Sequence, residues 1–293
     1  VAVIGAGGKM GTRTSNNLVT KFPDKFDVKL VETFPPAVER IEKERGLKVT
    51  PVDEALAFAD VVIFAVPDTL IKKLSAEYVP MLKPGTVFLI LDPAAAVAKE
   101  LTLRDDCTFG VAHPCHPSYF KWQKEEEAYQ DRFGGEGGHQ DIVMSCIQGD
   151  EEKFKLAQET ARCMYRADKA FVMTSEQIAF LEPTLVETLG ATCCYAMAET
   201  VNEAVKRGID REAAVSFLTG HVFNLTANFL GYLPGNPPVS DACKVALEIG
   251  NHLVLRDDWK KIWDDELLRK VIATMLHPET SQENLGFDVK PQK

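Results

Sequence analysis

Short apolar runs alternate with helix-period segments along the first half of the chain. The apolar runs cover residues 1–4, 28–31, 61–66, 87–91, 109–112 and 142–147. Between them, apolar residues recur at helical spacing over residues 10–20, 37–44, 52–57 and 70–81. This alternation predicts an α/β fold, in which helices cover a doubly wound, mostly parallel sheet.

The strand pattern stops near residue 151, and only helical periodicity follows. We therefore predict two domains, a sheet domain over 1–150 and an all-helical domain over 151–293. The longest helical pattern covers 177–207, with Thr174 and Gln177 at capping-box spacing before it and a break or kink at Pro183.

Further helices are predicted after Asp210, after Ser240 or Asp241, and over 264–276, because these acidic and hydroxyl residues suit N-caps. The polar tail after residue 277 is expected to be extended or mobile. The irregular insertion 119–140 is either a solvated loop or a mobile flap over a site.

Composition narrows the class of protein. The 293 residues are 45% hydrophobic and 26% charged, which is typical of a globular protein. The net charge of −10 disfavours nucleic acid binding, and no apolar run reaches the roughly 18 residues of a membrane span. We expect a cytoplasmic protein without nucleic acid or membrane partners. Seven cysteines without a C-x-x-C pair predict reduced thiols in the core. The chain opens inside a strand pattern, so we expect a few native residues before Val1.

The strongest local motif is the glycine-rich stretch Gly5-Ala-Gly7-Gly8-Lys9-Met10-Gly11, which follows a predicted strand and opens a predicted helix. Glycines there permit a tight turn and let backbone N–H groups approach a pyrophosphate at a helix N-terminus. The spacing matches G-x-x-G-x-x-G more closely than the strict G-x-G-x-x-G. The stretch predicts a dinucleotide-binding turn.

Acidic residues and a proline follow other predicted strands. Glu32 ends the second apolar run, where a carboxylate binds the ribose hydroxyls of NAD and repels the 2′-phosphate of NADP. We therefore predict NAD as the cofactor, the alternative being that Glu32 is an ordinary solvated strand end. Pro67, Asp68 and Asp92 follow strands at the edge where open α/β sheets bind ligands, so we predict that they line the cofactor groove.

Two histidines follow another predicted strand, in Ala112-His113-Pro114-Cys115-His116-Pro117-Ser118. The prolines restrict the backbone, so both imidazoles are rigidly placed at the ligand edge. Each histidine can be a general acid or base, a metal ligand, or a satisfied histidine of a structural turn.

The long helical pattern carries Glu182, Glu187 and Glu199, and it has no Lys or Arg between residues 170 and 205. Carboxylates on an apolar helix are costly unless they reach water or a metal. Glu182, beside Pro183, is the one that we predict to point at a site, whereas Glu199 suits a structural role.

Polar side chains recur at helical spacing further on. His221, Asn224 and Asn228 stand at i, i+3 and i+7, and their hydrogen-bonding groups suit a polyol, although such stripes are often only solvated helix faces. A second stripe on the next predicted helix contributes Lys244 as a candidate.

The glycine turn, Glu32, the Ala65-Val66-Pro67 strand end and the helical second half together resemble the 6-phosphogluconate and β-hydroxyacid dehydrogenase superfamily over nearly the whole chain. The resemblance implies a Rossmann domain and an all-helical domain through which members often dimerise. The catalytic lysine motif of that superfamily has no counterpart, since Gly190 is followed by Ala-Thr-Cys-Cys-Tyr-Ala-Met. Lysine-based β-hydroxyacid oxidation is therefore not expected.

The strings H-P-C-H-P-S, G-H-V-F-N-L-T-A-N-F-L-G and S-D-A-C-K-V-A-L-E resemble the D-apionate oxidoisomerases, NAD-dependent enzymes of sugar-acid catabolism in this superfamily. The resemblance implies oxidation of the hydroxyl next to the carboxylate and a hydroxymethyl shift, giving 3-oxo-isoapionate. Such a shift needs a Lewis acid, and His113 and Glu182 are then implied as ligands of one divalent ion, Mg, Mn, Ca or Zn. His116 is implied as the base, and Lys244 as the partner of the substrate carboxylate.

Two alternatives of other kinds stay open. One is a simple NAD-dependent dehydrogenase of a small hydroxy acid, with His113 as acid/base and no metal. The other is a non-catalytic NAD-sensing protein, in which the histidine turn is structural. In each case the long apolar helices of the second half predict a homodimer that buries them.

Overall fold

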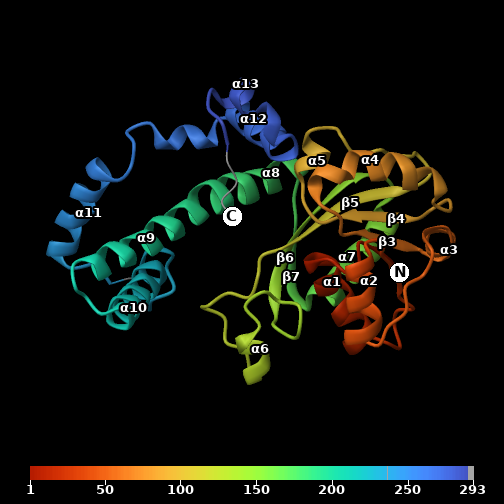
Figure 1. The fold of residues 1–293 in the computed structure, drawn as a ribbon, viewed down its shortest axis with the longest axis horizontal. Helices are drawn as coiled ribbons and strands as arrows, with labels where there is room; N and C mark the ends of the chain where they lie inside the picture. The colour runs from red at the N-terminus through yellow and green to blue at the C-terminus, as the bar shows by residue number, and fades with distance from the viewer. Residues whose placement is uncertain (236, 290–293) are drawn as a thin grey trace. The chain divides into compact units, whose positions relative to one another are not determined.

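The computed structural model describes residues 1–235 and 237–289. The chain divides into two compact units, Val1–Phe180 with Arg269–Lys293 and Leu181–Leu268. The first unit contains the sheet, and the second contains helices (Figure 1).

A seven-stranded sheet in the order β2-β1-β3-β4-β5-β6-β7 forms the centre of the first unit. Strands β1 to β5 are parallel, β6 runs antiparallel to β5, and β7 runs parallel to β6. The strands are β1 (Ala2–Ile4), β2 (Lys29–Val31), β3 (Val61–Phe64), β4 (Val87–Ile90), β5 (Thr108–Pro114), β6 (Gln140–Gln148) and β7 (Ala167–Val172).

The six predicted strands are all present, because their apolar runs are buried on both faces of the sheet. Aromatic rings contact one another across β3, β4 and β5. The ring centroid of Phe88 lies 4.9 Å from that of Phe64 and 5.6 Å from that of Phe109. Several of the predicted site residues lie at or just after the carboxyl ends of these central strands.

Helices cover both faces of the sheet, with α4 and α5 on one side and α1 and α7 on the other (Figure 1). The doubly wound prediction is therefore confirmed. The helical segments of the first unit up to residue 179 are α1 (Lys9–Lys21), α2 (Pro35–Glu39), the π-helix η1 (Arg40–Glu44), α3 (Val52–Phe58), α4 (Asp68–Tyr78), the 3-10 helix η2 (Val79–Met81), α5 (Ala94–Val97), α6 (Glu126–Gln130), α7 (Glu151–Tyr165) and α8 (Ser175–Ala179).

The domain boundary predicted at residue 150 is wrong, because β7 lies beyond it and joins the sheet. Helix α7 ends at Arg166, whose left-handed φ of 48° turns the chain into β7. The strand escaped prediction because it lies at the sheet edge, where four of its six residues are exposed and the charged residues Asp168 and Lys169 interrupt its apolar pattern. The first compact unit consequently continues to Phe180.

The predicted capping box is confirmed at the start of α8. The Thr174 hydroxyl accepts a hydrogen bond from the Gln177 N–H, and the Gln177 side chain accepts one from the Thr174 N–H. Pro183 lies inside the π-helix η3 (Phe180–Ala191), which continues α8 without a gap. The helical irregularity predicted at this proline is therefore present.

The second unit contains α9 (Thr192–Lys206), α10 (Arg211–Phe229), α11 (Asp241–Leu253) and the 3-10 helix η4 (Trp259–Trp263). Asp210 and Ser240 are N-caps as predicted, since their side chains accept hydrogen bonds from the N–H groups of Ala213 and Cys243. An apolar groove of about 360 Å³ is lined by residues of α9 and α10 and the turn between them. No residue of α11 is buried.

The tail after residue 277 is not simply extended. Helix α12 (Asp265–Leu276) is followed by the 3-10 helix η5 (Pro278–Thr280) and α13 (Ser281–Leu285). The His277 Nε2 atom lies 2.9 Å from Glu100 Oε1, which attaches this segment to the end of α5. Residues 290–293 of the predicted tail lie outside the described residues.

None of the described helices is long and apolar enough to cross a membrane. None of the seven cysteines, all within the described residues, forms a disulfide, as predicted. Only Cys107 and Cys163 are buried, so the expectation of core thiols is wrong for the others. Cys146, Cys193 and Cys194 lie at solvent-exposed strand or helix positions that periodicity alone did not distinguish, and Cys115 is exposed in the loop after β5.

Candidate active site

The glycine turn joins β1 to α1 so closely that side chains are excluded. A Cβ atom on Gly5 would lie 2.4 Å from the Ala65 carbonyl oxygen, and Gly5 has a φ of 76°. A Cβ atom on Gly11 would lie 2.0 Å from the Gly5 carbonyl oxygen, and one on Gly7 would lie 2.7 Å from Ala37 Cβ. These three positions require glycine, mainly because fixed backbone atoms stand in the way.

The glycine spacing that the structure requires is thus G-x-G-x-x-x-G, whereas the sequence matched G-x-x-G-x-x-G more closely. Gly8 is instead the N-cap of α1, and Lys9 and Met10 open the helix. The first turn of α1, which the structure describes in full, contains no acidic residue. Its N–H groups and the helix dipole therefore favour an anion such as a pyrophosphate.

Glu32 lies against this turn. Its Oε2 accepts a hydrogen bond from the Gly7 N–H at 3.0 Å, and its Oε1 accepts bonds from Thr33 and Phe34 at 2.9 and 3.0 Å. The Arg40 guanidinium donates to the Gly7 carbonyl at 2.8 Å. The carboxylate is thus fixed beside the turn, at the end of β2, where a ribose diol would meet it.

A cavity of about 500 Å³ opens beside the turn and is lined by Gly7, Gly8, Lys9 and residues of the insertion 119–140. A larger hollow of about 750 Å³ is lined by residues of 19–30 and 47–54, and it contains none of the predicted site residues. We therefore associate the smaller cavity, which opens beside the glycine turn, with the candidate dinucleotide-binding site.

The strand ends next to the turn carry the other candidates for the cofactor groove. Pro67 is the N-cap of α4 and Asp68 is its first residue, and both are exposed. Asp92 follows β4, and its Oδ1 accepts a hydrogen bond from the Ala94 N–H at 2.8 Å.

His113 lies near the end of β5, and its Nδ1 is 2.7 Å from the Leu91 carbonyl oxygen. Because a carbonyl can only accept, Nδ1 carries the proton, which we assign from this partner. In this tautomer Nε2 holds the lone pair that can bind a cation, and a carbonyl partner of this kind is typical of metal-binding histidines.

Three residues offer ligand atoms at one point. The site contains one ligand atom each from Asp92, His113 and Glu182, and these three atoms lie within 4.8 Å of one another. All three residues are half-buried. Glu182 belongs to η3, which runs on from α8, and stands next to Pro183. This separation suits three ligands of a single ion, and two carboxylates with one imidazole suit a hard or borderline divalent cation.

The sequence analysis assigned Asp92 to the cofactor groove and did not group it with His113 and Glu182. A usable signal was present, because Asp92 follows β4 and His113 ends the neighbouring parallel strand β5. The carboxyl ends of adjacent parallel strands share one edge of the sheet.

His116 differs from His113 in its surroundings. It is exposed, its φ is 61°, and its ring centroid lies 5.4 Å from that of Phe133 in the insertion. His116 is not among the residues that form the three-ligand group.

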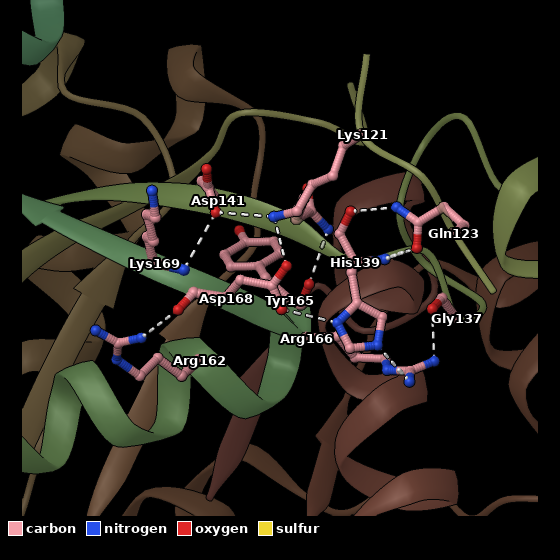
Figure 2. Close-up of polar contacts among 11 residues, drawn as sticks. Lys121, Gln123, Gly137, His139, Asp141, Arg162, Tyr165, Arg166, Asp168 and Lys169 are labelled. Carbon is pink, nitrogen blue, oxygen red and sulfur yellow. Dashed lines mark hydrogen bonds and ion pairs between the residues drawn. The ribbon is translucent and has the colours of Figure 1, made fainter. Parts of the chain in front are cut away.

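The insertion 119–140 is attached to the sheet edge by charged residues (Figure 2). Lys121 forms ion pairs with Asp141 and Asp168. The His139 Nδ1 atom lies 2.9 Å from Asp168 Oδ1, and its Nε2 lies 2.7 Å from Arg166. Although partial burial raises the pKa of Asp168, its bonds to Lys121 and His139 hold that pKa below its ordinary value. The part of the insertion around these residues is anchored, and is not a purely solvated loop.

The substrate candidates lie in the second unit. On α10 the His221 ring stacks on Phe217 with centroids 4.1 Å apart, and Asn228 donates to the Pro237 carbonyl. Asn224 is exposed on the same helix, and Lys244 Nζ lies 2.8 Å from Asp241 on α11. Their roles toward a substrate stay predictions. Glu199 accepts a hydrogen bond from Asn202 on its own helix, in keeping with a structural role.

A doubly wound sheet with a glycine turn and a carboxylate at the end of its second strand, followed by a helical unit, defines the class as a dinucleotide-dependent oxidoreductase. In agreement, the family described as phosphogluconate dehydrogenase (decarboxylating) C-terminal matches residues 121–276.

Close relatives identify the family within that class. A D-apionate oxidoisomerase of Blautia hydrogenotrophica is 72% identical over 96% of this chain and 98% of its own. A D-apionate oxidoisomerase of Cupriavidus necator is 41% identical over 93% of this chain and 97% of its own. The crystal structure of a semialdehyde dehydrogenase NAD-binding protein from Cupriavidus necator, in complex with calcium and NAD, has a TM-score of 0.87 and 41% identity over 94% of this chain and 98% of that one. The chain belongs to the D-apionate oxidoisomerase family.

Proposed function

We propose that the protein oxidises D-apionate with NAD and then shifts a hydroxymethyl group, forming 3-oxo-isoapionate. The observation that carries this proposal is the 72% identity, over almost the whole chain, to a D-apionate oxidoisomerase. The proposal accounts for both the dinucleotide turn and the three-ligand group of Asp92, His113 and Glu182.

The dinucleotide is proposed to bind at the glycine turn. The first turn of α1 receives the pyrophosphate, and Glu32 receives the ribose diol in place of some of its present backbone donors. The negative charge of Glu32 opposes a 2′-phosphate, which favours NAD over NADP. Pro67 and Asp68 border the groove from the end of β3.

The reaction has two steps. In the first, the C2 hydroxyl of the substrate loses a proton to a base, and its carbon loses a hydride to NAD, which leaves a ketone. In the second, the C3 hydroxyl loses its proton and becomes a ketone while a hydroxymethyl group moves with its bonding electrons from C3 to C2. The C2 oxygen takes up a proton, so the second step is redox-neutral.

Asp92, His113 and Glu182 are proposed to hold one divalent cation. Their donor set and their separation of at most 4.8 Å fit such an ion. When bound, the ion supplies Lewis-acid polarisation of the substrate ketone. The Leu91 carbonyl keeps the His113 ring in the tautomer that can bind it.

His116 is proposed as the base that takes the C2 hydroxyl proton, because it follows the same strand as His113 and is accessible. Lys244 is proposed to bind the substrate carboxylate, and His221, Asn224 and Asn228 are proposed to bind its hydroxyl groups. These roles rest on the chemistry of the side chains.

We also propose that the protein is a homodimer that buries the second unit. Large apolar side chains there are widely exposed, among them Leu253 at 80%, Val254 at 76% and Phe217 at 70%. Exposed apolar surface on this scale marks an interface.

The test is NADH formation from D-apionate and from an unbranched five-carbon sugar acid, each with and without a chelator. The proposal predicts NADH from D-apionate only, and loss of activity with chelator that added divalent ion restores. NADH from the unbranched acid alone would contradict the substrate assignment. Full activity in the chelator would favour a simple dehydrogenase.

A further inference from the structure

One carboxylate organises the segment 131–138, which we call the Asp131 loop. The side chain of Asp131 accepts hydrogen bonds from five successive backbone N–H groups. The donors to Oδ1 are Gly134 (2.8 Å) and Gly135 (3.2 Å), and the donors to Oδ2 are Glu136 (2.7 Å), Gly137 (2.9 Å) and Gly138 (2.9 Å). Partial burial raises the pKa of Asp131, but these bonds outweigh it and hold the pKa below its ordinary value.

The Asp131 loop is attached on one side to α1, the helix that opens at the glycine turn. Arg13 is only 2% exposed, and its Nε donates to the Gly134 carbonyl at 3.4 Å. The Asn16 side chain donates to the Gly135 carbonyl at 3.0 Å. Gly134 has a φ of 83°, and a Cβ atom there would lie 2.4 Å from the Gln140 side chain of β6 and 3.0 Å from the Arg13 guanidinium of α1, so glycine suits this position.

On its other side the loop contacts the turn that carries His116. The Phe133 ring centroid lies 5.4 Å from that of His116 and 4.3 Å from Lys9 Nζ. A Cβ atom on Gly138 would lie 3.0 Å from Pro117 Cγ, the residue after His116. Phe133 therefore stands between the first residue of α1 and the proposed base.

His116 has a left-handed backbone in the turn that follows β5. Its φ of 61° is in the left-handed region, which residues other than glycine adopt rarely. Phe133 is a rigid aromatic neighbour of the exposed His116 imidazole and limits its orientations. Orientation of a general base matters because proton transfer requires close contact with the substrate hydroxyl.

We propose that Phe133, presented by the Asp131 loop, is a positioning residue that orients His116 while the same loop contacts the dinucleotide-binding helix. The inference rests on the proposed role of His116 as base. Phe133 itself touches neither reacting atom in this account. It limits the orientations of the imidazole, so its removal lowers the rate of proton transfer, and because Phe133 also lines the cavity beside the glycine turn, cofactor affinity is measured separately.

The experiment compares Phe133→Ala, Phe133→Tyr and the matched control Trp122→Ala. Trp122 is an aromatic residue of the same insertion, but it is 81% exposed and contacts Tyr129. In Phe133→Ala we expect kcat to fall roughly ten- to a hundredfold, the scale of a misplaced catalytic group, with a changed pH profile. Both are measured at saturating NAD, because Phe133 also lines the cavity beside the glycine turn. Phe133→Tyr should retain the kcat and pH profile of the unchanged protein, and Trp122→Ala should leave both unchanged.

His116→Gln, measured in parallel, separates the two claims. Loss of turnover in His116→Gln with normal kcat and pH profile in Phe133→Ala would overturn the positioning role alone. Full turnover in His116→Gln would contradict the proposed base and, with it, this inference. If melting shows that Phe133→Ala does not fold, Phe133→Leu retains apolar packing without the ring, and the same two readouts then decide.

Discussion

His113 Nδ1 donates to the carbonyl of Leu91 at 2.7 Å, and the next residue after Leu91 is Asp92. The end of β4 therefore does two things for the neighbouring strand. Its carbonyl fixes the tautomer of His113, and its next side chain adds a carboxylate to the same group of ligand atoms. A histidine and a carboxylate are thus brought together by strand pairing, without any sequence proximity.

Removal of one ligand should weaken metal binding strongly. For His113→Ala and Glu182→Gln we expect calcium affinity, measured by calorimetry, to fall by more than the about 10- to 100-fold that loss of an outer-shell partner costs. Turnover should be lost with it, while NAD affinity stays nearly intact because the glycine turn and Glu32, which are proposed to hold the dinucleotide, are unaltered. His252→Ala, an exposed histidine outside the group, is the control. Unchanged calcium binding in both ligand variants would show that the ion is held elsewhere.

Glu32 should set both cofactor affinity and choice. In Glu32→Ala we expect NAD binding to weaken by about 1 to 3 kcal/mol, the scale for lost hydrogen bonds to a charged group. Glu32→Gln keeps an acceptor oxygen without the charge, so it should retain more NAD affinity and discriminate less against NADP. Titration of both cofactors into each protein measures this, and tighter binding of NADP than NAD by the unchanged protein would refute the prediction.

Dimerisation should depend on the exposed apolar surface of α11. We expect a dimer in sedimentation, and Leu253→Asp should weaken it by about 2 kcal/mol or more, because a charge without a partner is costly in an interface. Leu103→Asp places the same charge on an exposed apolar position of the first unit and should remain dimeric. A monodisperse monomer of the unchanged protein would contradict the prediction.

Acid should remove the contribution of Asp131 to stability. The pKa of Asp131 is lowered in the folded protein, so its ionised form stabilises the fold at pH values above the pKa of about 3.9 that it has in the unfolded chain. This stabilisation is lost as the pH falls through the pKa of the folded protein. At pH 7 we expect Asp131→Asn to melt about 2 to 4 °C below the unchanged protein, as for a loss near 1 kcal/mol in a large domain. The difference in melting temperature between the two proteins should narrow below about pH 4. A gap that stays constant from pH 7 to pH 3 would mean that the charge of Asp131 is not what holds the loop.

Strands buried on both faces were predictable because burial selects continuous apolar residues. That rule identified β1 to β6 and failed for β7, which has solvent on its outer edge and shows the mixed residues Asp168, Lys169 and Phe171. Helix caps were predictable because a hydroxyl or carboxylate at one position binds an N–H three residues later, as Thr174, Asp210 and Ser240 do.

Contacts between segments that are distant in the sequence could not be predicted from it. The requirement for glycine at positions 5 and 7 depends on how closely the chain after β3 and helix α2 approach the turn. The role of Asp131 depends on five N–H groups converging on one carboxylate, and Phe133 meets His116 only after the insertion folds back. Periodicity describes each element separately, so such convergence appears only in three dimensions.

The proposed reaction is an oxidation followed by a carbon shift, and the fate of one carbon atom distinguishes it from a simple oxidation. D-Apionate labelled with ¹³C at C2 is incubated with the protein, NAD and divalent ion, and the product is observed by ¹³C NMR while NADH is measured. The account predicts one NADH per product and a labelled carbon that bears a hydroxyl group and no hydrogen, because the hydroxymethyl group has moved to it. A labelled ketone carbon formed with NADH would contradict the rearrangement and leave a simple dehydrogenase.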